Sequence, residues 1–362
     1  MSDSTFYSLQ ISEIEQETDS AVCLSFAVPA ELKDKFNFTQ GQHLTLRKTI
    51  DGQEIRRSYS ICSGIHDSSL KVAIKAIDGG VFSTYANSQL KANDYIDVMP
   101  PQGDFNTPLS ADNAKKYMCI CAGSGITPIL SIVKSILSSE PESQVTLLFG
   151  NKNSSTIMFK DDLGFLKNRY LTRFNWLNIL SREEQDTDIL FGRLDNKKGS
   201  QLQASHLIDI PGSDEFFLCG PESMISEVSR GLRSSGVDEA HIHYELFFAS
   251  AEDAQAVVEK HHARAAQYAG QQAEVMVTVG GRSSRFKLAA DGENILDAAL
   301  NNGADLPFSC KGGVCATCKA KLIEGEVEMD LNHALSDSEV AEGFILTCQS
   351  HPVSDRVVVD FD

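Results

Sequence analysis

The first hundred residues alternate apolar and polar positions in short runs that are separated by turn residues. Such alternation places one face of each run against a core, and it predicts the strands of an antiparallel sheet. The predicted strands are 21–28, 43–48, 56–60, 70–77 and 95–99. Their regular spacing is typical of an antiparallel β-barrel or sandwich.

From residue 116 onward, short apolar runs alternate with longer amphipathic segments. The predicted strands are 117–121, 145–149, 177–180, 215–219 and 241–246. The predicted helices include 127–137 and 222–234, and Gly236 is placed to cap the second of these. This alternation predicts an α/β domain with a parallel sheet.

The last part of the chain begins with 249–272, a polar segment rich in Ala, Gln, Glu and His that predicts an interdomain linker with some helical tendency. A predicted hairpin follows around Gly280 and Gly281, with strands 274–279 and 284–288, then a helix at 295–302 and a final strand at 356–361. We therefore predict domains at 1–110, 111–248 and 273–362.

Charge and composition narrow the class of function. The 362 residues carry a formal net charge of -18, which argues against binding to nucleic acids or to anionic membranes. The N-terminus lacks a basic start followed by an apolar run, and no apolar stretch approaches membrane-spanning length. We expect a cytoplasmic protein.

Four cysteines, Cys310, Cys315, Cys318 and Cys348, have the C-x4-C-x2-C…C spacing of a plant-type [2Fe-2S] site. Two irons, each held by two sulfides and two thiolates, need four such ligands. Small residues between the first two cysteines leave space for backbone N–H groups to point at the sulfurs. Structural zinc is the alternative, but zinc ribbons usually present two C-x2-C pairs, whereas this chain has one.

The remaining cysteines include Cys23, Cys62, Cys119 and Cys121, which have no ligand-like spacing. We interpret these four as small buried apolar residues.

The sequence Arg57-Ser58-Tyr59-Ser60 places a guanidinium, an aromatic ring and a hydroxyl on one predicted strand. Arg57 could pair with a flavin diphosphate, Tyr59 could stack on the isoalloxazine ring, and Ser60 could donate a hydrogen bond near flavin N5. Taken alone, an Arg-Tyr pair on a strand is more often surface packing.

A glycine turn and a helix start at Gly79-Gly80-Val81-Phe82-Ser83 supply a second candidate phosphate site. Free N–H groups at a helix N-terminus bind phosphate, and the Ser83 hydroxyl could act as a cap. Gly80, Val81 and Ser83, together with Lys75, are the predicted cofactor contacts of this region.

The loop Ala122-Gly123-Ser124-Gly125-Ile126-Thr127-Pro128 lies between a predicted strand and a predicted helix. Gly123 and Gly125 allow close approach of a dinucleotide diphosphate, and Thr127 is the predicted N-cap. Cys219-Gly220-Pro221, which ends a later parallel strand, would form the other side of the crevice. Each loop alone is often only a turn, and Cys219 alone would more often be a core residue.

These motifs occur in the order found in the ferredoxin-NADP reductase superfamily, and the C-terminal cysteine motif resembles its oxygenase-reductase branch. The segments Gly41 to Leu46, Arg57 to Cys62 and Cys310 to Lys319, and the ending Val357 to Phe361, are similar to the reductase subunits of phenylacetyl-CoA epoxidases. The resemblance covers essentially the whole chain. It implies a FAD-binding β-barrel domain, an NAD(P)-binding α/β domain and a β-grasp ferredoxin domain.

The resemblance also implies the roles of the predicted site residues. Arg57, Gly80 and Ser83 would contact the FAD phosphates, and Tyr59 and Ser60 the flavin ring. The loop from Gly123 to Pro128 and Cys219 to Pro221 would bind NADPH or NADH, with Tyr59, Ser60 and Cys219 nearest the chemistry. Ser181 and Arg182 follow the third parallel strand, where the family binds the adenosine 2′-phosphate. They favour NADPH, although a surface arginine is nearly as good an explanation.

The predicted reaction passes a hydride from NAD(P)H to FAD, and then single electrons through the [2Fe-2S] cluster to a partner. In the resembling family the partner is a di-iron oxygenase that epoxidises phenylacetyl-CoA in phenylacetate catabolism. A Rieske dioxygenase, another monooxygenase or a hybrid-cluster protein could use the same chain of cofactors. A redox sensor without turnover is an alternative of a different class.

The segment from residue 273 to the end contains 15 acidic and 7 basic residues. Solubility is the commoner reason for such a surface. The run Glu324, Glu326, Glu328 and Asp330 is nevertheless a predicted docking face for a basic patch on the acceptor.

Overall fold

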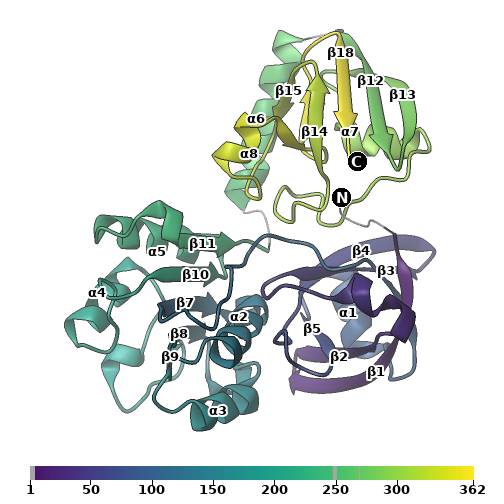
Figure 1. Ribbon diagram of the computed structural model, residues 1–362. Helices are drawn as coiled ribbons and strands as arrows, with labels where there is room; N and C mark the ends of the chain where they lie inside the picture. The colour runs from purple at the N-terminus through teal and green to yellow at the C-terminus, as the bar shows by residue number, and fades with distance from the viewer. Residues whose placement is uncertain (1–4, 248–250, 269) are drawn as a thin grey trace. The chain divides into compact units, whose positions relative to one another are not determined.

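The computed structural model describes residues 5–247, 251–268 and 270–362. These residues form two compact units, 5–245 and 246–362. The first unit contains a β-domain and an α/β domain, and the second contains three helices and a mixed β-sheet (Figure 1).

The β-domain is a six-stranded antiparallel sheet with the order β4-β3-β6-β1-β2-β5. Its strands are β1 Tyr7–Thr18, β2 Ala21–Ala27, β3 His43–Ile50, β4 Gln53–Ser60, β5 Leu70–Lys75 and β6 Tyr95–Val98. A bridge between Ile61 and Val72 joins the end of β4 to β5, so the two edges of the sheet meet. This closure confirms the predicted antiparallel barrel. Helix α1, Val81–Ser88, packs against it through buried Phe82.

Strand β1 was absent from the prediction, although it is the longest strand of the barrel at 12 residues. Leu9 and Ile11 are its only fully buried residues, and most of its other positions are polar. Its stability comes from backbone pairing with β2 and β6. Apolar alternation is too weak in such a strand to identify it.

The α/β domain has a five-stranded parallel sheet with the order β11-β10-β7-β8-β9. Its strands are β7 Lys116–Ala122, β8 Gln144–Asn151, β9 Phe174–Leu180, β10 Glu215–Cys219 and β11 Ile242–Glu245. Its helices are α2 Ile126–Ser139, α3 Lys160–Arg169, α4 Asn196–Ala204 and α5 Glu222–Ser234. The predicted parallel sheet is thus confirmed, and Gly236 follows α5 with the positive φ of a C-cap glycine.

The direction of strand addition reverses between β7 and β10. From β7 the chain proceeds outward through β8 to β9, and it then returns to add β10 and β11 on the other side of β7. Because parallel crossovers are right-handed, α2 and α3 cover one face of the sheet, and α4 and α5 cover the other (Figure 1). The carboxyl ends of β7 and β10 therefore flank a topological switch point, where open sheets bind ligands.

The second unit has a five-stranded mixed sheet with the order β13-β12-β18-β14-β16. Its strands are β12 Gln272–Val279, β13 Arg282–Ala289, β14 Lys319–Glu324, β15 Val327–Met329, β16 Phe344–Leu346, β17 Ser350–Pro352 and β18 Arg356–Asp360, where β15 and β17 form a separate pair. Helix α7, Ile295–Asn301, packs on this sheet, and α8 is Asp337–Ala341. The β12–β18 pair is parallel, and the predicted hairpin turns at Gly280 and Gly281 with positive φ.

The segment predicted as a linker contains helix α6, Ala251–Gln267, while residues 249, 250 and 269 of that prediction lie outside the described residues. Arg264 in α6 is 1% exposed, and it donates hydrogen bonds to the Ala290 carbonyl and, at 2.7 Å, to the Asp330 carboxylate. Lys260 donates to the Met329 and Asp330 carbonyls. The end of α6 is therefore built into the core of the second unit.

Candidate functional site

Strand β4 carries the predicted flavin-binding tetrapeptide at its end. Arg57 is exposed, the Tyr59 ring is half-buried, and Ser60 is 4% exposed. The Tyr59 ring lies 5.6 Å from the ring of Phe82 in α1, centroid to centroid. This contact holds β4 beside the helix that begins after the glycine turn, so the two predicted flavin elements adjoin each other.

The glycine turn before α1 differs from the prediction in one respect. Gly80 is the N-cap residue of α1, and no side chain caps the helix. The Ser83 hydroxyl is buried, where it accepts a hydrogen bond from Ile77 N–H at 3.2 Å and donates to the Gly80 carbonyl. Ser83 therefore fixes the turn from inside, which leaves the first N–H groups of the helix available to an anion.

Lys75, at the end of β5, reaches the glycine loop of the α/β domain. Its ammonium nitrogen would lie 3.8 Å from a Cβ built on Gly123. Burial, and then repulsion from Lys152, lower the pKa of Lys75. Within the described residues neither lysine has an ion-pair partner, so the two charges provide a site for an anionic ligand at this loop.

The two predicted nucleotide loops touch each other at the switch point. Gly125 follows β7 and packs on the end of β10, where a Cβ on it would lie 2.2 Å from the Cys219 carbonyl oxygen. Only glycine permits this approach of the two backbones. The Cys219 side chain is fully buried, and burial raises the pKa of its thiol well above the ordinary value.

Thr127 is not the N-cap of α2, contrary to the prediction. A single 3-10 turn at Gly123–Gly125 runs directly into the helix, which begins at Ile126 with Gly125 as its N-cap. The Thr127 hydroxyl therefore lies inside the first turn, where it donates a hydrogen bond to the Ser124 carbonyl at 3.0 Å.

A carboxyl group that the sequence analysis missed lies between the two domains of the first unit. Glu245 ends β11 beside Cys219 of β10, and Ser60 of the barrel donates a hydrogen bond to its Oε2 at 3.2 Å. Burial raises the pKa of Glu245 to about 8. Glu245 thus lies beside two of the three predicted catalytic residues: it accepts a hydrogen bond from Ser60, and it is the neighbour of Cys219 in the β10–β11 pair.

A sequence signal for Glu245 does exist, because it is an acidic residue at the carboxyl end of a predicted parallel strand. That signal is weak, since many strands end in polar residues. The hydrogen-bond partner of Glu245, Ser60, is 185 residues away in the chain, so the sequence does not show that the two residues meet.

The residues after β9 lie beside the end of β8. Ser181 N–H and Arg182 N–H donate to the carbonyls of Asn151 and Lys152, respectively, and the Arg182 side chain is exposed. The Glu183 carboxylate accepts from both the N–H and the hydroxyl of Ser154, at 2.8 and 3.0 Å. Glu183 is therefore engaged within the protein, whereas Arg182 is directed to solvent.

The four predicted cluster ligands come together as two thiol pairs. Cys310 is hydrogen-bonded with Cys315, and Cys318 is hydrogen-bonded with Cys348. The hydrogen bond from Cys315 lowers the pKa of Cys310, and so do backbone N–H groups of the loop, of which Gly312 N–H lies 3.3 Å from the sulfur. A backbone N–H group of the loop thus points at the Cys310 sulfur, as expected for a cluster ligand.

The cluster loop holds several residues in the left-handed region, among them Gly313 with φ of 75°. A Cβ on Gly313 would lie 3.2 Å from both the Leu331 carbonyl oxygen and the Gln349 side chain. The Gln349 amide in turn donates to the Lys311 carbonyl at 3.0 Å, which ties the loop to the segment that carries Cys348. These contacts bring the distant fourth cysteine to the first three.

Comparisons with known protein families agree with this geometry. An oxidoreductase FAD-binding domain matches residues 8–107, an oxidoreductase NAD-binding domain matches 119–230, and a 2Fe-2S iron-sulfur cluster binding domain matches 277–353. The chain is 44% identical over 358 residues to one subunit of the 1,2-phenylacetyl-CoA epoxidase of Escherichia coli K12, and the match covers 99% of this chain and 98% of the relative.

The chain belongs to the family of phenylacetyl-CoA epoxidase reductase subunits and related oxygenase reductases. It is also 32% identical to the ferredoxin reductase component of 3-ketosteroid-9-alpha-monooxygenase of Rhodococcus rhodochrous, over 98% of this chain and 96% of the relative. Among solved structures, phthalate dioxygenase reductase has the same fold, with a TM-score of 0.59, 20% identity and 98% of each chain covered.

The family membership establishes the class of activity. The protein is an NAD(P)H-dependent flavin and iron–sulfur reductase that delivers electrons to an oxygenase system. The predicted types of domain and the predicted cofactors, FAD and a [2Fe-2S] cluster, are confirmed. In the described part of the chain, no helix combines the length and apolar character that a bilayer-spanning segment needs.

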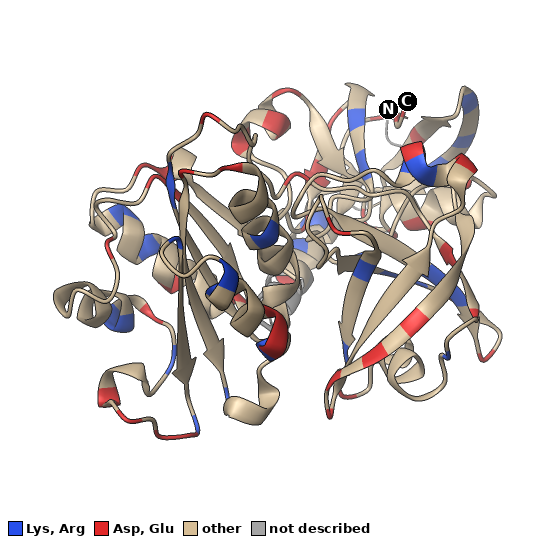
Figure 2. Ribbon diagram, turned by 60° about the horizontal axis from the view of Figure 1, so that its bottom comes forward, with Lys and Arg blue, Asp and Glu red and all other residues tan. Residues whose placement is uncertain are grey.

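The predicted acidic docking face is wrong at one of its four positions. Asp330 is 6% exposed and binds Arg264, and it also accepts from His351 at 3.0 Å, so it belongs to the core. Glu324, Glu326 and Glu328 are exposed. Acidic and basic positions are otherwise interspersed along the ribbons of both units (Figure 2).

Proposed function

We propose that the protein reduces the oxygenase component of a phenylacetyl-CoA epoxidase. The 44% identity to a subunit of the Escherichia coli epoxidase, which extends over nearly the whole of both chains, carries this proposal. The identity to the ketosteroid monooxygenase reductase is lower, at 32%. The acidic carboxylates of the second unit would meet a basic surface on the oxygenase.

We assign the cofactor contacts as follows. The first N–H groups of α1, together with Arg57, would bind the FAD phosphates, and Tyr59 would pack on the flavin ring. The loops that meet at Gly125 and Cys219 would bind the diphosphate and nicotinamide of the donor. The four cysteines would ligate the [2Fe-2S] cluster. FAD bound there would supply a hydride acceptor, and the cluster would supply a one-electron carrier.

Within this site, Ser60 and Glu245 control a proton. Because the pKa of Glu245 is about 8, its carboxyl group is protonated at neutral pH. It would hold that proton beside the Ser60 hydroxyl, in a half-buried position. Glu245 would thereby keep negative charge away from the site while the nicotinamide and flavin meet, and it could return a proton through Ser60.

Reconstitution with purified oxygenase components tests the proposed partner. We expect NADPH-dependent epoxidation of phenylacetyl-CoA with the epoxidase oxygenase component, and a much lower rate with the oxygenase component of a 3-ketosteroid-9-alpha-monooxygenase. Cytochrome c reduction by the same preparation verifies that the reductase is active. Equal rates with both oxygenases, or a preference for the ketosteroid enzyme, would refute this partner.

We further propose that NADPH is the preferred donor. Arg182 is exposed at the carboxyl end of β9 with Lys152 on the neighbouring loop, where these cations would bind a 2′-phosphate. The neighbouring carboxylate of Glu183 is held by the N–H and the hydroxyl of Ser154.

Replacement of Arg182 by alanine tests this preference. A hydrogen bond between charged groups contributes about 1.5 to 3 kcal/mol, so the Michaelis constant for NADPH should rise at least tenfold and that for NADH should change little. Arg169→Ala is a matched control, because Arg169 is also exposed but ends α3 just before the start of β9, whereas Arg182 follows the other end of that strand. A similar loss with both nucleotides would remove the support for NADPH.

A further inference from the structure

Two buried thiols of the β-domain lie in direct contact, apart from the cluster loop. Cys23 in β2 and Cys62, just after β4, are 1% and 2% exposed, and their sulfur atoms are 3.9 Å apart. Two thiolates bound to tetrahedral zinc at about 2.3 Å each are separated by about 3.8 Å. The observed spacing therefore fits a shared metal ion, whereas a disulfide would require the sulfurs to approach to about 2.05 Å.

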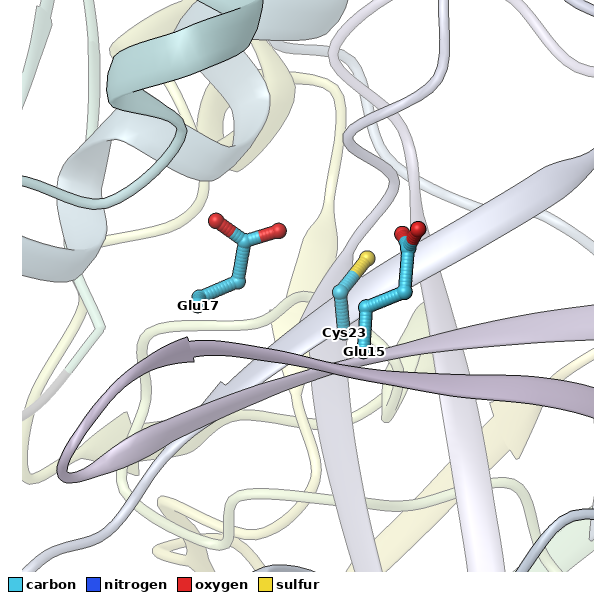
Figure 3. A group of neighbouring side chains, drawn as sticks. All are labelled: Glu15, Glu17 and Cys23. Atoms are coloured by element: carbon cyan, nitrogen blue, oxygen red, sulfur yellow. The ribbon is translucent and has the colours of Figure 1, made fainter.

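Two carboxylates of β1 lie beside Cys23, and with it they form a group of three possible metal ligands to which Cys62 would add the fourth. Oxygen atoms of Glu15 and Glu17 and the sulfur of Cys23 all lie within 4.8 Å of one another. The three side chains project to the same side of the β1–β2 hairpin, with the Cys23 sulfur between the two carboxylates (Figure 3). Lys71 and the Phe159 N–H bind the Oε2 atoms, which leaves an Oε1 atom of each carboxylate for a metal.

The surrounding cavity, about 250 Å³ in volume, has an excess of negative charge. Its charged lining residues are four carboxylates and two lysines: Glu15, Glu17, Asp67, Asp162, Lys71 and Lys134. Lys71 pairs with Glu15, and Lys134 with Asp67 and Asp162, whereas within the described residues Glu17 has no lysine partner. This excess of negative charge would attract a divalent cation, and the two protons released by the cysteine thiols on binding would balance the charge of that cation.

We propose that Glu15, Glu17, Cys23 and Cys62 bind a zinc ion in the FAD-binding domain. The mixture of two thiolates and two carboxylates suits zinc, which accepts sulfur and oxygen ligands in one tetrahedral site. The ion would join β1 and β2 to the segment after β4, which pairs with β5 where the barrel closes. Because Cys62 lies two residues beyond Ser60, zinc would also brace the strand end that contacts the flavin.

The metal content of the holoprotein tests this site. After equilibration with zinc chloride and removal of excess zinc, elemental analysis should find about one zinc per chain in addition to the cluster iron. Cys23→Ser and Cys62→Ser should each lose this zinc but retain iron and FAD. Cys119→Ser, which changes a thiol buried in β7, should keep it. Zinc that persists in the Cys23 and Cys62 variants would overturn the proposal, as would its absence from the parent protein.

A second comparison separates metal ligation from the stability of the hairpin. Glu15→Gln and Lys71→Gln break the same ion pair, but only Glu15→Gln removes a ligand. Titration against a chromophoric zinc chelator should show at least a tenfold weaker affinity for Glu15→Gln and an equal or tighter affinity for Lys71→Gln. Equal weakening in both variants would overturn the site. A Cys23–Cys62 disulfide found by peptide mapping of the native protein would do the same.

Discussion

Replacement of Glu245 by glutamine isolates the buried carboxyl group between the two domains of the first unit. Glutamine has nearly the same size and can still accept the Ser60 hydrogen bond, but it does not titrate. In the folded protein the pKa of Glu245 is about 8, compared with an ordinary value of 4.5. The folded state therefore binds more protons than the unfolded state between these two values, so this group costs stability as the pH rises from 4.5 to 8.

The size of the effect follows from the same pKa. Between pH 6 and pH 9, ionisation of Glu245 should lower the free energy of unfolding of the parent protein by roughly 2 to 3 kcal/mol. Over about two pH units of this interval, Glu245 is ionised in the unfolded chain but still protonated in the folded protein. Glu245→Gln should escape this loss. For a unit of this size, the difference in melting temperature between variant and parent should grow by roughly 5 to 10 °C across the interval.

Thermal unfolding of the FAD-loaded protein, followed by the fluorescence of released flavin, provides the measurement. Taking the difference between variant and parent at each pH cancels the other titrating groups. Ser60→Ala is the control, because it retains the carboxyl group and removes a hydrogen bond that lowers its pKa, so it should keep the pH dependence and displace it upward. A difference that stays constant or shrinks as the pH rises would refute the assignment of a protonated Glu245.

Three further predictions concern the second unit. Cys315→Ser should leave NADPH-dependent ferricyanide reduction largely unchanged and abolish cytochrome c reduction. Loss of both activities would show that the cluster domain, through which electrons leave the protein, does not function separately from the flavin domain. Asp330→Asn should destabilise the second unit by about 3 to 5 kcal/mol in denaturant titrations, because it leaves the buried Arg264 charge without its partner; an unchanged midpoint would contradict this. Electron transfer to the oxygenase should slow as salt rises from about 10 mM to about 0.5 M, and Glu326→Lys should reproduce that loss at low salt. If stopped-flow rates of electron transfer to the oxygenase change neither with salt nor with Glu326→Lys, electrostatic docking is excluded.

The sequence was sufficient to predict those elements whose pattern of residues is local and repeated. Strand β7 and helix α2 were predicted within a few residues of their ends, because continuous apolar runs and a 3.6-residue period identify buried elements. The cysteine motif predicted the cluster-binding domain for the same reason, since three of its four ligands are close in sequence. Helices α3 and α4 were missed, because their composition is polar and each buries only a few apolar side chains.

Features that depend on contacts between distant segments were not predicted. One local feature was also predicted wrongly: Thr127 is not the N-cap, because the 3-10 turn just before it moves the start of the helix to Ile126. Glu245 acquires its raised pKa from burial between two domains, and no neighbour in the sequence indicates that burial. The contact between Cys23 and Cys62 likewise exists only because the barrel closes beside both residues.

In the acidic run from Glu324 to Asp330, burial decides whether a carboxylate can attract a partner protein. Burial alone would oppose ionisation of Asp330, but hydrogen bonds from His351 and Arg264 outweigh it and hold the pKa of Asp330 at about 2. Its charge is thus neutralised inside the protein and cannot attract a partner. Glu328 lies 3.9 Å from the same arginine, and Glu324 lies 3.5 Å from Arg356. Glu326 is the residue of this run whose carboxylate has no ion-pair partner among the described residues, and its reversal is consequently the sharpest probe of docking.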